Sequence, residues 1–301
     1  MKGKIFAGLL LGTMAVGITT QEREGIYSYK VGQFEVFMLV EGQRQGSAGI
    51  LVGADEALLK RYIPAEGFFH TANAFLIKVP GSSGSPGSSG SLGRNILVDA
   101  GTGAGGVLLE KIKKLRVEPD QVDAVLITHL HGDHFGGLHK DGQANFPKAK
   151  IYLSSRELEY FTKTNINQGA VAALAPYSTR IETFNPAELG GRLTELLPGI
   201  TPIAAYGHTP GHTVFLVENS GAKLIIWGDL MHIALVQFPV PEISATYDMD
   251  AGASAVMRRQ FMDYAAKNKI PVGGMHIVYP GLGTVEIDGE GFRFVPKNKL
   301  F

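Results

Sequence analysis

The stretch Thr128-His129-Leu130-His131-Gly132-Asp133-His134 places three histidines and an aspartate directly after an apolar run, Val122 to Ile127. The apolar run has the length and composition of a buried strand, so the stretch is expected to be a loop at the strand's end. Imidazole and carboxylate groups suit zinc and its first-row neighbours, and the chain has no cysteine to offer a thiolate. A polar surface turn is the alternative, but it would give these crowded side chains little to interact with. The stretch therefore predicts a metal site.

Three further motifs follow in order along the chain. They are Gly207-His208-Thr209-Pro210-Gly211-His212-Thr213, Gly228-Asp229-Leu230-Met231-His232 and Gly274-Met275-His276-Ile277. Together with the first stretch, they resemble the signature of the metallo-β-lactamase superfamily, over nearly the whole chain past residue 25. The resemblance implies an α/β (α+β) fold, the four-layer αββα sandwich. Its two sheets would lie face to face with helices outside and ligands at the strand ends of one edge.

The resemblance also implies a set of metal ligands. His129, His131 and His208 would hold one ion, Asp133, His134 and His276 a second, and Asp229 would bridge the two. Five imidazoles and two carboxylates suffice for two divalent cations, zinc above all, with positions left for water and substrate. His212 competes with His208, which is preferred because it precedes Thr-x-Gly. His139 is expected to be a solvated bystander.

The aspartate at position 229 separates branches of that superfamily. True β-lactamases generally have a cysteine ligand in that part of the chain, whereas a bridging aspartate is typical of lactonases, thioesterases, phosphotriesterases and nucleases. The segments Gly228 to Phe238 and His276 to Pro296 resemble the branch of methyl parathion hydrolase and acyl-homoserine lactone lactonases. The expected function is therefore the opening of lactone rings, N-acyl-homoserine lactones in particular, which is quorum quenching. The alternative is an organophosphate triesterase or aryl esterase.

The expected reaction is attack by a metal-bound hydroxide on the carbonyl, with Asp133 or Asp229 assisting proton transfer to the leaving alkoxide. Many lactonases have a tyrosine three residues after the bridging aspartate, and this chain has His232 there. His232 either donates a hydrogen bond to the substrate oxygen or packs behind the ligands. Both readings stay open at the sequence level.

A glycine turn supports a competing hypothesis. Gly101, Gly103 and Gly106 form a G-x-G-x-x-G pattern between an expected strand and a helix. The amides of such a turn can bind a pyrophosphate, which would make the protein a nicotinamide-dependent dehydrogenase. However, the turn is not in the first βαβ unit, and the histidine motif follows one helix later. The metal-dependent hydrolase is therefore preferred.

Composition sets the remaining bounds. With 301 residues and 45% hydrophobic residues, the chain can form a large core, and its formal net charge of zero gives no reason to expect nucleic acid as a partner. Lys2 and Lys4 precede an apolar run, Ile5 to Val16, that is too short to span a bilayer. Residues 1–20 are thus expected to be a signal peptide, with an uncleaved anchor as the alternative.

Several expectations follow from these bounds. The protein should be exported, periplasmic or secreted, without stable membrane insertion once the signal is cleaved. Residues 21–301 should form a single domain that acts on a small lactone or ester, and the resemblance implies a homodimer. The Gly/Ser-rich segment 81–93 is expected to be a flexible insertion within that domain.

Local patterns predict three further details. Ser154 and Glu157 could form a capping box at a helix start. Asp250 should cap a helix that runs to about Lys267. Phe68-Phe69 fits core packing better than the mouth of a pocket.

Overall fold

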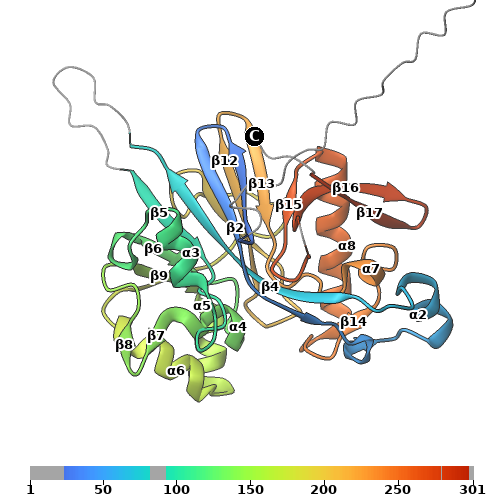
Figure 1. Cartoon of the computed structure of the whole chain (residues 1–301), viewed down its shortest axis with the longest axis horizontal. Coiled ribbons are helices and arrows are strands. Elements are labelled where there is room, and N and C mark those ends of the chain that lie inside the picture. The colour runs from blue at the N-terminus through green and yellow to red at the C-terminus, as the bar shows by residue number, and fades with distance from the viewer. Residues whose placement is uncertain (1–23, 82–92, 279, 298–301) are drawn as a thin grey trace, which may run out of the picture.

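Two β-sheets pack face to face in the computed structural model, which describes residues 24–81, 93–278 and 280–297 (Figure 1). The predicted signal peptide and nearly all of the Gly/Ser-rich segment lie outside the described residues. The first sheet has the order β1 (Ile26–Val31), β2 (Phe34–Gln45), β4 (Phe69–Val79), β5 (Arg94–Val98), β6 (Ala124–Leu126), β9 (Lys150–Ser154) and β10 (Ile181–Phe184). The second has the order β11 (Ile200–Ala204), β12 (Thr213–Asn219), β13 (Ala222–Ile226), β15 (Val272–Gly273), β16 (Leu282–Asp288) and β17 (Gly291–Pro296).

Helices cover the outer faces of both sheets (Figure 1). The first sheet is covered by α3 (Leu108–Lys114), α5 (Ser155–Glu159) and α6 (Gln168–Leu174), and the second by α8 (Ala251–Asn268). Between the two sheets and these helices lie three separate apolar cores. The predicted αββα sandwich is confirmed. Among the described residues, no helix is long and apolar enough to cross a membrane.

Alternation along the strands explains why there are three cores. On β2, Val36 and Met38 face the second sheet, whereas Phe37 and Leu39 face the helices. Successive side chains of a strand point to opposite faces, so a strand buried on both sides reads as a continuous apolar run.

The α8 helix begins as predicted. Asp250 Oδ1 accepts a hydrogen bond from Ala253 N at 2.9 Å, and the helix extends to Asn268. It ends with Lys269 in the left-handed region, at a φ of 54°. Its buried residues Phe261, Met262 and Ala265 pack against the second sheet.

The strands β2 and β4 extend beyond the first sheet as a two-stranded arm (Figure 1). The arm starts at a bulge between Val40 and Gly42 and continues to the pair Gln45 and Phe69. It leads to β3 (Leu51–Val52), which pairs with β14 (Ser244–Ala245), and to α2 (Glu56–Tyr62), which contacts α7 (Ala234–Gln237). The arm therefore crosses from one sheet to the edge of the other.

Candidate metal centre

The histidine-rich loop leaves the end of β6 and turns directly into α4 (Gly132–Phe135). His129 and His134 are buried, whereas His131 and Asp133 border a cavity. The other predicted ligands also follow strands. His208 comes after β11, Asp229 after β13 and His276 after β15. The structure brings all seven side chains together at one edge of the sandwich.

Asp99, at the end of β5, positions the loop from behind. Its Oδ1 accepts a hydrogen bond from Thr128 N at 2.8 Å, and its Oδ2 lies 2.7 Å from His134 Nδ1. Because an ionised carboxylate only accepts, His134 Nδ1 donates to it, and Nε2 is the nitrogen that can bind a cation once it has lost its proton. That Nε2 is buried and has no hydrogen-bond partner among the described residues. Burial lowers the pKa of His134, but the surrounding carboxylates, Asp229 first, raise it further and prevail.

Three imidazole nitrogens form the first group. His129 Nε2 lies 3.1 Å from His131 Nδ1, and His208 Nε2 lies 3.1 Å and 3.0 Å from these two atoms. A tetrahedral cation about 2.0–2.1 Å from each of three imidazole nitrogens holds them roughly 3.3 Å apart, so the observed spacing fits. Burial, followed by the neighbouring His208, lowers the pKa of His131 to about 3. A neutral imidazole is the form that binds metal.

A second group surrounds His134 Nε2 and His276 Nε2. Asp133 Oδ1 lies 3.6 Å from the former and its Oδ2 lies 3.6 Å from the latter. Asp229 Oδ2 lies 3.3 Å and 3.0 Å from the same two nitrogens. The same oxygen is also 3.7 Å from His129 Nε2 and 3.5 Å from His208 Nε2, in the first group. Asp229 thus lies between the groups, as expected of a bridging residue.

Unpartnered atoms in this cluster fit bound cations. Asp229 Oδ1 is buried without a hydrogen-bond partner within the described ranges. Burial raises the pKa of this carboxyl, but His134 and the other imidazoles lower it well below its usual range, so it is ionised. A buried carboxylate with a free oxygen is costly unless a cation or donor compensates it. The donor set can therefore bind metal.

Protein groups hold the far nitrogens of two ligands. His208 Nδ1 donates to Asp248 Oδ1 at 2.9 Å, and Asp248 Oδ2 accepts from Arg258 at 3.2 Å. Arg258 is fully buried on α8. His276 Nδ1 donates to the carbonyl of Thr71 at 2.7 Å. Such acceptors fix the tautomer and orientation of a ligating ring.

Glu157 on α5 joins the first two ligand loops. Its Oε1 accepts from Leu130 N at 2.7 Å, and its Oε2 accepts from Thr209 Oγ1 and Gly211 N, both at 2.8 Å. The predicted capping box is wrong, because Ser154 makes no side-chain cap and Glu157 points to the loops instead. Burial raises the pKa of Glu157, against the effect of these three donors.

The structure shows different surroundings for three histidines that are not in the predicted ligand set. His212 donates from Nδ1 to the carbonyl of Ala205 at 3.1 Å and accepts from Asp229 N at 3.0 Å, so neither nitrogen is free for a cation. His232 Nε2 lies 3.3 Å from Asp229 Oδ2, and the residue also borders the cavity. His139 lies outside the cluster.

The glycine turn has a ligand of its own. Glu41, on β2, accepts hydrogen bonds from Val107 N at 3.0 Å and from Thr102 N at 3.2 Å. A carboxylate of the same chain thus occupies amides on which a pyrophosphate would depend. Gly103 packs tightly against Gly136, where an added Cβ would lie 2.3 Å from a carbonyl oxygen. The glycine turn therefore packs against the segment that follows the histidine-rich loop. The structure does not support the dehydrogenase alternative.

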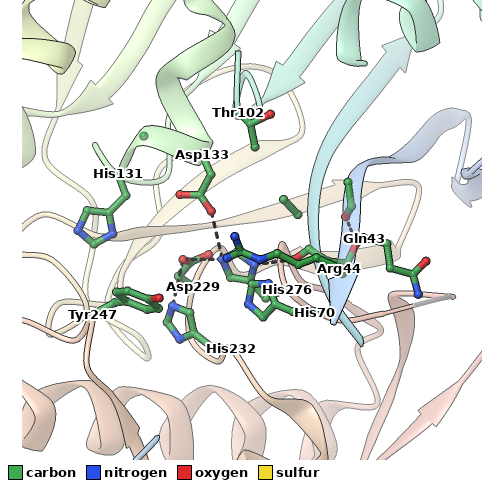
Figure 2. Close-up of a pocket in the computed structure, with 14 residues that line it drawn as sticks. Gln43, Arg44, His70, Thr102, His131, Asp133, Asp229, His232, Tyr247 and His276 are labelled. Carbon is green, nitrogen blue, oxygen red and sulfur yellow. Dashed lines mark hydrogen bonds and ion pairs between the residues drawn. The ribbon is translucent and has the colours of Figure 1, made fainter. Parts of the chain in front are cut away.

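A cavity of about 530 Å³ opens over the cluster (Figure 2). Its lining includes the expected site residues Asp133, Asp229, His232 and His276, and also Arg44, His70 and Tyr247, which no sequence motif contains. Only the fold brings these last three residues to the cavity. A second cavity of about 240 Å³ adjoins His232 and is bordered by Phe68 and Phe69. Phe69 is 56% exposed, so the expectation of core packing is wrong for this residue.

Comparison with known proteins identifies the class. The model of the metallo-beta-lactamase superfamily matches residues 90–267. The chain belongs to that superfamily and is a metal-dependent hydrolase.

Three relatives illustrate the similarity. The crystal structure of hydrolase AbOPH in the beta lactamase superfamily is 27% identical and aligns over 91% of this chain and 98% of that one, with a TM-score of 0.77. AidC, a dizinc quorum-quenching lactonase, has the same fold at 22% identity, over 92% and 99% of the two chains, with a TM-score of 0.75. The probable metallo-hydrolase YflN of Bacillus subtilis (strain 168) is 28% identical over 171 residues. This match covers 52% of the present chain and 60% of YflN.

Proposed function

We propose that the protein is a dinuclear metal hydrolase that opens lactone rings, N-acyl-homoserine lactones in particular. The observation that carries the proposal is the position of Asp229, whose Oδ2 lies 3.0–3.7 Å from imidazole nitrogens of both ligand groups. This arrangement offers two neighbouring cation sites on the floor of an open cavity.

Each of the two ligand groups provides one cation site. His129, His131 and His208 would hold one cation, Asp133, His134 and His276 would hold the other, and Asp229 lies within reach of both groups. Zinc is the cation that this set of imidazoles and carboxylates suits best. When bound, such a pair supplies Lewis acidity that lowers the pKa of water and polarises an ester carbonyl.

The side chain of Asp133 is suited to move a proton. It is 38% exposed and borders the cavity, whereas that of Asp229 is only 3% exposed. Burial raises the pKa of Asp133, but His134 and His276 lower it, and the net effect keeps the carboxylate ionised. It can therefore accept a proton from the attacking water and pass it to the leaving alkoxide.

The cavity and one relative support a lactone as substrate. A volume of about 530 Å³ lies within the range of small-molecule sites. The structure of AidC contains the product N-hexanoyl-L-homoserine, which is a ring-opened lactone. Metals that stabilise a developing oxyanion also suit phosphotriesters, so those compounds are the competing substrates.

Comparing two substrates on the zinc-loaded protein tests the proposal. We expect kcat/KM for an N-acyl-homoserine lactone to exceed that for a paraoxon-like triester. A preference for the triester of about a hundredfold or more would reject lactone hydrolysis. Metal analysis should find about two equivalents of zinc per chain, and a chain that binds fewer would reject the dinuclear centre.

A further inference from the structure

Arg44 and His70 form a second polar group in the cavity, apart from the metal ligands. They lie directly opposite each other on the β2–β4 arm, as partners in the antiparallel register. Directly opposed residues of an antiparallel pair have their side chains on the same face of the sheet. Both residues line the cavity, and Figure 2 shows the Arg44 side chain extended toward His276.

The guanidinium of Arg44 has no acidic partner. No carboxylate lies within ion-pair distance of it in the part of the chain that the structure describes, and it donates no hydrogen bond there. The Nε2 of His70 is buried and likewise unpaired among the described residues. The His70 ring lies 4.6 Å from the ring of His276, measured between centroids. A fixed cation and a free imidazole nitrogen are thus available beside the metal ligands.

The arm leaves open space beside this pair and the cluster. Gly42 and Ala72 are the next pair on the same face of the two strands, since side chains alternate with a period of two. Both border the cavity, and a Cβ added at Gly42 would meet no atom within 4 Å. A ligand can therefore extend from the metal ligands along the arm to Arg44.

We propose that Arg44 and His70 bind a carboxylate of the substrate that is separate from the scissile bond. The planar guanidinium matches a carboxylate in a bidentate geometry, and it has no competing acid in place. One fixed charge and one imidazole match the single charge of a carboxylate better than a phosphate dianion. The inference depends on the proposed hydrolase only for the position of the reacting group. It makes the preferred substrate a lactone or ester that also carries an acid.

Calorimetry on the zinc-loaded protein tests the carboxylate site without turnover. The ligands are linear diacids from succinate to pimelate, each compared with its own monoamide, in which a neutral amide replaces one carboxylate. We expect at least one diacid to bind about tenfold more tightly than its monoamide, because a hydrogen bond between charged groups is stronger than one to an amide. Equal affinities for every pair would overturn the proposal.

Variants attribute the preference to the pair. Arg44→Gln should remove the preference for the diacid, Arg44→Lys should retain part of it, and Arg192→Gln, at an exposed arginine outside the cavity, should leave it unchanged. If Arg44→Gln weakens diacid and monoamide equally, Arg44 binds a neutral carbonyl and the proposal fails. Gly42→Leu should weaken diacid binding with little effect on stability, because its side chain enters open space.

Activity assays separate this inference from the proposed function. A protein that opens no lactone but still prefers diacids through Arg44 would reject lactone hydrolysis and leave the carboxylate site standing. A protein that opens lactones but shows no preference for diacids would reject the carboxylate site and leave lactone hydrolysis standing.

Discussion

His134, His208 and His276 each have one ring nitrogen bonded by the protein and the other directed into the cluster. A carboxylate accepts from each of the first two rings, and a backbone carbonyl accepts from the third. The protein therefore sets the tautomer of these ligands before any cation arrives. Asp229 differs, since its Oδ1 has no hydrogen-bond partner among the described residues and its Oδ2 lies within 3.7 Å of imidazole nitrogens of both ligand groups.

Replacing Asp229 tests the centre most directly. We expect Asp229→Ala to lower kcat/KM by at least about a thousandfold and to reduce the bound zinc, because the residue contacts both ligand groups. Activity and metal content are measured on the same preparation. His139→Ala is the control and should change neither, since this histidine lies outside the cluster. Full activity in Asp229→Ala would refute the assignment.

Asp248 should give the protein a defined response to acid. Burial raises the pKa of this carboxyl, but the hydrogen bond from His208 and then the attraction of Arg258 lower it to about 2. The ordinary value is about 3.9, so Asp248 stabilises the fold above about pH 4 and loses this effect as the pH falls toward 2. At neutral pH the difference corresponds to about 2 kcal/mol of unfolding free energy.

The variant Asp248→Asn isolates this effect. We expect its unfolding free energy to fall below that of the native protein at neutral pH, and the gap to narrow between about pH 5 and pH 2.5. Urea denaturation of the metal-free proteins over this pH range measures the difference in unfolding free energy. A gap that stays constant through this range would show that the charge of Asp248 is unimportant.

At the scale of elements, α5 stabilises two ligand loops through one side chain. Glu157 accepts hydrogen bonds from the loop that carries His129 and from the loop that carries His208. The helix itself is short and has no side-chain cap. Its role is therefore to hold these loops at a fixed separation.

Removing this connection should destabilise the fold and loosen the centre. In Glu157→Gln, an amide group replaces one acceptor oxygen and faces backbone or hydroxyl donors. We expect a loss of about 2 kcal/mol in unfolding free energy and weaker zinc binding. Glu159→Gln, at an exposed position of the same helix, is the matched control and should change neither. Equal stability of the two variants in chemical denaturation would contradict the role given to Glu157.

Sequence patterns predicted most elements but few of their partners. The apolar run before the histidine-rich stretch predicted β6, and the cap at Asp250 predicted α8, because these signals lie within a few residues of one another. The partners of Glu157 are 27 to 54 residues away, and Glu41 reaches across 61 and 66 residues to the glycine turn. Such contacts depend on how the sheets assemble. For the same reason, the sequence alone does not identify Arg44 and His70 as cavity residues, because only the β2–β4 arm brings them there.

At the scale of the whole molecule, the cluster is where the two sheets depend on each other. The first sheet supplies the histidine-rich loop after β6, and the second supplies the residues after β11, β13 and β15. Between the two sheets, Asp229 lies 3.3 Å from His134 and 3.7 Å from His129, and Asp133 lies 3.6 Å from His276. Bound metal should therefore contribute to the stability of the entire sandwich.

Chelation measures this contribution. Ligand binding to the native state alone adds about 2.7 kcal/mol when its concentration is a hundred times Kd. We expect removal of zinc to lower Tm by about 5 °C or more, and added zinc to restore it. An unchanged Tm in a protein shown to have lost its metal would mean that bound metal does not contribute to the stability of the fold.

The shared position of Asp229 has one more consequence. Asp229 Oδ2 is close to both ligand groups. An ion that binds in one site therefore changes the position of a donor atom that the other site also needs. Occupancy of the two sites is therefore thermodynamically coupled, and each ion alters the affinity of the other by the same factor. Titration with zinc should accordingly show two unequal, interdependent steps instead of two independent ones, and the order of filling should not affect the total free energy.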